Sequence, residues 1–176
     1  ASCRYGTSGD VDKMESYLEE LGVLASAHPE DQEIRKRLLM GLINKSNISR
    51  TAEDIDKMEG YLEDLRDLAI VNPEDLWVRR LLAMVLANAS CRYGTSVDVD
   101  KMESYLEELR VLATSEDLEV QEFLAMGLAN ASNRYETVGN VDKVECCLEE
   151  LGVLASAHPE DSGVRKYLAM GLANAS

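Results

Sequence analysis

The sequence predicts an all-α protein, an α-solenoid of antiparallel helix pairs with about eight helices in a right-handed superhelix. Three observations lead to this fold class. A block of 42–44 residues occurs four times in the 176-residue chain, at 3–46, 47–90, 91–132 and 133–176, and a fixed period of this length indicates a stacked array. Apolar residues recur within each block at the three- and four-residue steps of one helix face. No segment alternates apolar and polar residues as a half-buried strand does.

The first predicted helix of each copy is acidic on one side and apolar on the other. In copy one it covers 10–27, where Met14, Leu18 and Leu21 share one face and Glu19 and Glu20 fall opposite. Short polar residues precede or open these helices in all four copies, and such side chains accept hydrogen bonds from free amides at a helix start. The expected N-caps are Asp10, Asp54, Asp98 and Asn140.

The second predicted helix of each copy follows a proline, except in copy three. Pro29, Pro73 and Pro159 suit the first helical position, where no amide hydrogen is needed. Copy three lacks the proline and two residues, so Ser115 or Thr114 is expected to cap its helix. In copy two this helix continues through 78–90, and in copy four it covers 162–176.

Glycine recurs inside the second helix, as Gly41, Gly127 and Gly171. A glycine inside a helix costs about 1 kcal/mol relative to alanine. Its repeated use at one position indicates the close approach of a neighbouring helix.

The residues at the junction between copies resemble a known family. The tetratricopeptide repeat is similar to the order found here: the run LAMGLANAS, then RYGTSGD, then a helix and a proline. Residues of copy one fall at that family's Tyr, Gly-Asp, packing and Pro positions: Tyr5, Gly9, Asp10, Met14, Leu18, Leu21 and Pro29. The usual repeat has about 34 residues, so the longer period here is similar to the extended repeats of kinesin light chains. The resemblance implies that the second helix lines a concave face and the acidic helix forms a convex face.

Composition narrows the classes of partner and chemistry. The net charge is −15, carried entirely by the four acidic helices, so neither nucleic acid nor a membrane surface is expected as a partner. The four cysteines show no C-x-x-C spacing, and the two histidines are far apart in the array. We therefore expect no metal site, no cofactor and no enzymatic activity, and a cytoplasmic, intracellular location.

An asparagine column is the main candidate site. Its members recur at intervals of 44, 42 and 44 residues: Asn44, Asn88, Asn130 and Asn174. An Asn amide donates and accepts at once, which suits a peptide bond, and related tetratricopeptide domains hold extended peptides in this way. The alternatives are a ladder of hydrogen bonds between helices, or simple inheritance from a duplicated unit.

Basic residues on the same helices extend this candidate site. Arg35, Arg37, Arg79 and Arg80 lie in copies one and two, whereas copy three carries Glu119 and Glu122 on the equivalent helix. This division predicts a groove that steers a peptide with acidic and basic ends. The alternative is a solvated surface that prevents aggregation.

These observations predict a protein-interaction scaffold that binds peptide or helical segments on the concave face. One alternative is a structural repeat that assembles with itself, and another is an engineered or excised array without a native ligand. Self-assembly would use the two end helices. Helix 162–176 has an apolar face at Val164, Leu168, Leu172 and Ala173. The first acidic helix lacks its preceding partner helix. The surfaces of these two helices are therefore expected to fit one another between molecules, head to tail, and to form a homo-oligomer.

Overall fold

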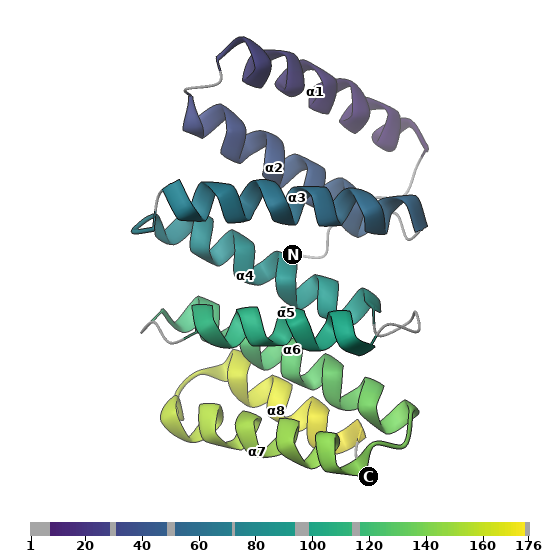
Figure 1. Ribbon diagram of the computed structural model, residues 1–176, viewed down its shortest axis with the longest axis vertical. Coiled ribbons are helices and arrows are strands. Elements are labelled where there is room, and N and C mark those ends of the chain that lie inside the picture. Colours follow the sequence, from purple (N-terminus) through teal and green to yellow (C-terminus); the bar gives the residue numbers. More distant parts are fainter. Residues whose placement is uncertain are drawn as a thin grey trace. The chain divides into compact units, whose positions relative to one another are not determined.

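The computed structural model describes residues 8–28, 31–48, 52–71, 73–93, 99–113 and 117–174, and within these ranges it holds eight α-helices and no strand (Figure 1). The all-α class is thus confirmed for the described chain. The helices are α1 (Ser8–Ala27), α2 (Gln32–Ile48), α3 (Ala52–Val71), α4 (Leu76–Tyr93), α5 (Val99–Leu112), α6 (Leu118–Thr137), α7 (Val141–Ala157) and α8 (Ser162–Asn174).

The chain divides into two compact units, Ala1–Asp67 and Leu68–Ser176, with the division inside α3. In the first unit α1 packs on α2. The second unit contains α4 to α8. The single array over 1–176 and its superhelical form remain predictions.

The second unit has two layers of helices. Helices α4, α6 and α8 pack against one another in succession, α5 packs on α4 and α6, and α7 packs on α6 and α8. Figure 1 shows α5 and α7 on the near side of this unit. The apolar core lies between the layers and includes fully buried Leu86, Leu106, Leu128 and Leu151.

Aspartate, not proline, marks the start of the second helix of each copy. Oδ1 of Asp31, Asp75, Asp117 and Asp161 accepts hydrogen bonds from backbone amides two or three residues on. The prediction for Pro73 and Pro159 is therefore wrong, because both precede the capping aspartate by two residues. At copy four the Asp161 amide closes a turn onto the His158 carbonyl at 3.0 Å, and a proline in second place favours such a turn.

The other predicted caps have mixed outcomes. Asn140 is confirmed, since its side chain accepts from the Lys143 amide at the start of α7. Helices α1 and α3 begin two residues before Asp10 and Asp54, so those two predictions are wrong. Pro29, Asp98, Thr114 and Ser115 lie outside the described residues, but the cap of α6 is Asp117.

The glycine prediction is supported where the helices meet. A Cβ placed on Gly127 would lie 3.0 Å from Leu109 Cδ1, and one on Gly171 would lie 2.9 Å from Leu148 Cδ2. Gly139 has a different role, because it ends α6 with a φ of 74°, a conformation that favours glycine. Next to it, the Asn140 amide bonds to the Tyr135 carbonyl, so Asn140 ends one helix and caps the next.

Candidate functional site

Three residues spaced four apart recur along the second helix of each copy, and in α4, α6 and α8 all three are described and accessible. The first is charged in every copy, the second is methionine and the third is asparagine. In the second unit the methionines and asparagines are Met84 and Asn88 in α4, Met126 and Asn130 in α6, and Met170 and Asn174 in α8. We call these six residues the Met–Asn stripe.

Burial shows which side of each helix the Met–Asn stripe occupies. In α4 and α6 the stripe residues are half-buried, whereas the core-facing Leu86 and Leu128 are fully buried. In α8 both stripe residues are exposed. Residues at i, i+4 and i+8 share one side of a helix, so the Met–Asn stripe runs along the solvent-accessible side of this layer.

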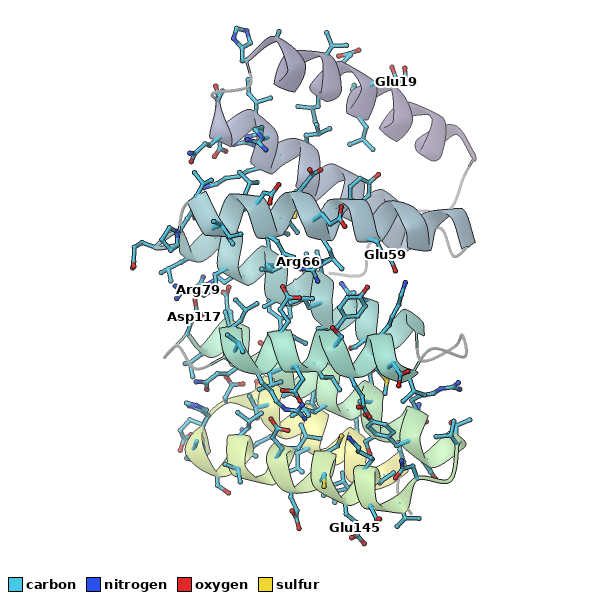
Figure 2. All side chains as sticks on the ribbon, viewed as in Figure 1. Glu19, Glu59, Arg66, Arg79, Asp117 and Glu145 are labelled. Carbon is cyan, nitrogen blue, oxygen red and sulfur yellow. The ribbon has the colours of Figure 1, made fainter. Side chains whose placement is uncertain are left out.

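Contacts at the helix starts place the three lines next to one another. Arg80 near the start of α4 pairs through Nε with Asp117 Oδ2 at 2.8 Å and through Nη1 with Glu119 Oε2 at 2.9 Å, at the start of α6. The Glu122 side chain of α6 lies against Gly163 near the start of α8. Figure 2 shows Arg79 and Asp117 at the same edge of this unit. The helices therefore begin together, and equivalent positions of the stripe lie on adjacent helices.

The asparagines in the middle of the stripe lack partners inside the described part of the chain. Neither the Asn88 nor the Asn130 side chain makes a hydrogen bond there. The ladder of hydrogen bonds between asparagines is therefore not present at these two positions. Asn174 is exposed at the end of α8, and the side chain of Asn44 lies outside the described residues.

The four arginines divide between the two compact units, and some of them already have partners within their own unit. Arg35 and Arg37 lie in α2 of the first unit, where Arg37 pairs with Glu33 at 2.8 Å. In the second unit, Arg79 Nη2 donates to the Pro73 carbonyl at 2.8 Å. Arg80 is already neutralised by two carboxylates, so its predicted role in attracting an acidic peptide is weakened.

The pair of Arg80 and Asp117 perturbs both groups. The hydrogen bond from Arg80 to Asp117 raises the arginine pKa above its ordinary value. Burial raises the pKa of Asp117, but hydrogen bonds from Arg80 and from the amides of Glu119 and Val120 outweigh it and lower the pKa overall. Asp117 thus stays ionised as both a helix cap and an ion-pair partner.

A second group of polar side chains joins the other layer. Glu103 in α5 accepts a hydrogen bond from the Tyr135 hydroxyl at 2.9 Å and pairs with Lys143 of α7 at 3.1 Å. Two turns along, Arg110 binds Glu150 through Nε and Nη2 at 2.8–3.0 Å. These side chains line a hollow of about 420 Å³.

The electrostatics of this hollow indicate structural ion pairs. The hydrogen bond from Tyr135, followed by that from Lys143, lowers the pKa of Glu103. Burial and the bond to Glu103 raise the pKa of Tyr135. Burial also raises the pKa of Cys147 to about 11, so this thiol is protonated at neutral pH and a poor nucleophile. Each acid is matched to a donor, and no acid–base pair is poised for proton transfer.

Sequence reasoning missed the methionine column of the Met–Asn stripe. Methionine recurs at 40, 84, 126 and 170, with the same intervals as asparagine, and always four residues before it. The signal was present, but methionine on a helix more often packs in a core, so recurrence alone did not separate a surface column from a buried one.

No protein-family model, curated protein or solved structure matches this chain. Among the described residues, no helix combines the length and apolar character needed to cross a membrane. The same part of the chain contains no group of three or more His, Cys, Asp or Glu side chains arranged to hold a metal ion.

Proposed function

We propose that the protein is an interaction scaffold of the tetratricopeptide type, an α-solenoid of antiparallel helix pairs that binds peptide or helical segments along the Met–Asn stripe. The observation that carries this proposal is the pair Asn88 and Asn130, accessible on adjacent helices and without an internal hydrogen-bond partner in the described chain. Half-buried amides without partners suit a ligand that supplies the missing bonds.

The spacing of the two asparagines suits an extended peptide. Packed helices lie about 8–10 Å apart, and an extended chain rises about 3.3 Å per residue. Equivalent side chains on α4 and α6 therefore match peptide groups about three residues apart. An Asn amide can donate to one peptide carbonyl and accept from one peptide amide.

The methionines would supply apolar contact beside these hydrogen bonds. Met84 and Met126 lie one turn from Asn88 and Asn130 and are half-buried. Methionine has three rotatable bonds and a polarizable sulfur, so it adapts to ligands of different shape. This combination favours a partner with a peptide backbone for the amides and apolar side chains for the thioethers.

The test is a selection of peptides from a random displayed library on the 176-residue protein. Peptides that bind should lose about 1–3 kcal/mol of binding free energy on Asn88→Ala with Asn130→Ala, while the thermal midpoint stays unchanged. Ser104→Ala, an exposed polar-to-alanine change in α5 on the other layer, serves as the matched control. If selected peptides bind the double variant as well as the wild type, the asparagines do not hold the peptide and the proposal is wrong. If the midpoint falls together with the affinity, the asparagines have a packing role instead.

A further inference from the structure

The C-terminal half of α8 exposes positions that are buried in the equivalent helices. Leu172 is 52% exposed, while its counterparts Leu128 in α6 and Leu86 in α4 are each 0% exposed. Ala173 is likewise exposed where Ala129 is buried. Val164 in the first turn is fully buried and Leu168 is half-buried, so the prediction of an exposed apolar face is wrong for Val164 and correct for Leu172 and Ala173.

Helix α1 shows the complementary difference at the other end of the chain. Tyr17 is 65% exposed, whereas Tyr105 and Cys147, at the same repeat position in α5 and α7, are 7% and 3% exposed. Leu21 is half-buried in α1, and its counterpart Leu109 is fully buried. The same sequence position therefore changes from core to surface in this helix.

Contacts inside the second unit explain what normally buries these positions. Helix α6 packs against both α7 and α8, and α7 in turn packs against α6 and α8. Leu128 of α6 and Cys147 of α7 are both buried, and they lie on two helices of successive copies that pack against each other. Leu172 of α8 and Tyr17 of α1 thus represent the two sides of a repeat-to-repeat contact, each exposed in this chain.

We propose that α8 of one molecule receives α1 and α2 of a second copy of this chain, head to tail, in the geometry of an internal repeat contact. Charge complementarity supports this partner. Inside the molecule Arg80 pairs with Asp117 and Glu119. The equivalent residues across the proposed contact are Lys166 on α8 and Asp31 and Glu33 on α2, all exposed and with the same charge signs as Arg80, Asp117 and Glu119. Asp31 caps α2 as Asp117 caps α6, and Glu33 also pairs with Arg37 inside α2.

The contact is heterologous, because α8 of one copy and α1 of the next contribute different surfaces. Such contacts extend into open filaments or close into rings. This association is separate from peptide binding by the Met–Asn stripe residues Asn88 and Asn130, so either can fail while the other holds.

Sedimentation of the 176-residue protein from micromolar to hundreds of micromolar tests the proposal. The mean mass should rise with concentration. Leu172→Glu alone and Tyr17→Asp alone should each weaken association about a hundredfold or more, because each would bury an unpaired charge. Both side chains are exposed, so the thermal midpoint should not move, and Val111→Glu in α5, at a residue 70% exposed, is the matched control.

Mixing the two variants gives the sharper result. Each retains one intact surface, so an equimolar mixture should form dimers and nothing larger. A charge exchange adds a second readout: Lys166→Glu should weaken association about fivefold, and Glu33→Lys in the same chain should restore it. A monomer at every concentration, association unchanged in both single variants, or a mixture that stays monomeric would each overturn the proposal.

Discussion

The junctions between α4 and α6 and between α6 and α8 use the same positions with different chemistry. At the first, Arg80 pairs with Asp117 and Glu119. At the second, Arg80 is replaced by Glu122 and Glu119 by Gly163, and the Glu122 side chain occupies the space over the glycine. An ion pair at one junction thus corresponds, at the next junction, to a carboxylate that packs against the backbone of a glycine.

This difference shows that the polar edge does not determine how the helices pack. Val78, Val120 and Val164 occupy equivalent first-turn positions and are all 0% exposed, whether an arginine, a glutamate or a lysine lies two residues on. Apolar burial is non-directional and roughly proportional to area, so it tolerates such changes at its rim. The polar contacts at this edge add small increments of stability that differ from one junction to the next.

The largest expected difference in the free energy of unfolding is between variants of two capping aspartates, Asp117 and Asp161. Asp161→Ala removes only a helix cap and should lower the free energy of unfolding by about 1 kcal/mol. Asp117→Ala removes the cap and also leaves Arg80 without its closest partner, so it should cost more. Chemical denaturation of both variants measures the difference. Equal losses would show that the ion pair contributes nothing to the first junction.

The pH dependence of the same pair provides a control. The pKa of Asp117 is lowered in the folded protein, so its contribution is complete above the ordinary carboxyl pKa of about 3.9. It is lost as pH falls through the lowered folded value. The stability gap between wild type and Asp117→Asn should therefore be constant near neutral pH and close in acid. A gap that widens in acid would contradict this assignment.

The capping aspartates also show what the sequence could and could not predict. Helical periodicity was sufficient for the helices and the all-α class. Proline tolerates the first helical position, so the sequence predicts it as the helix start, but the aspartate two residues later satisfies two amides at once. Asp31, Asp75, Asp117 and Asp161 recur at 44, 42 and 44 residues, so comparison of the four copies would have found them.

The candidate site was only partly accessible from sequence for a different reason. The asparagine column was visible as a repeat, but its burial and lack of partners depend on how neighbouring helices pack. The engagement of Arg80 with Asp117, 37 residues away, requires the register between α4 and α6. Local sequence patterns do not contain that register. The prediction of a basic patch therefore could not include the carboxylate that pairs with Arg80.

A middle-sized effect should follow from rebuilding the first junction at the second. Glu122→Arg with Gly163→Glu recreates the Arg80–Glu119 pair beside Asp161. We expect a coupling of about 1 kcal/mol between the two changes, because a glutamate in the first turn favours the helix dipole and now faces a cation. Gly163→Glu alone should give no gain, since its side chain would meet Glu122. Additive effects in a double-mutant cycle would contradict the equivalence of the two junctions.

The smallest expected effect is on the other layer, where Arg110 of α5 binds Glu150 of α7. Copy four carries Gly152 at the arginine position, so this layer too repeats its backbone without repeating its ion pair. The two side chains are 34% and 30% exposed, and water and salt therefore screen much of their attraction. The geometry is bidentate, which favours the upper part of the range for such pairs. A double-mutant cycle with Arg110→Met and Glu150→Gln should give a coupling of about 0.5–1 kcal/mol at low salt, and less at high salt.

Arg110→Lys should lose most of that coupling, because a lysine cannot form the paired bonds. A coupling well above this range and insensitive to salt would mean that the pair is effectively buried, and that polar contacts specify the packing of α5 and α7 in a way the α4–α6–α8 layer does not require.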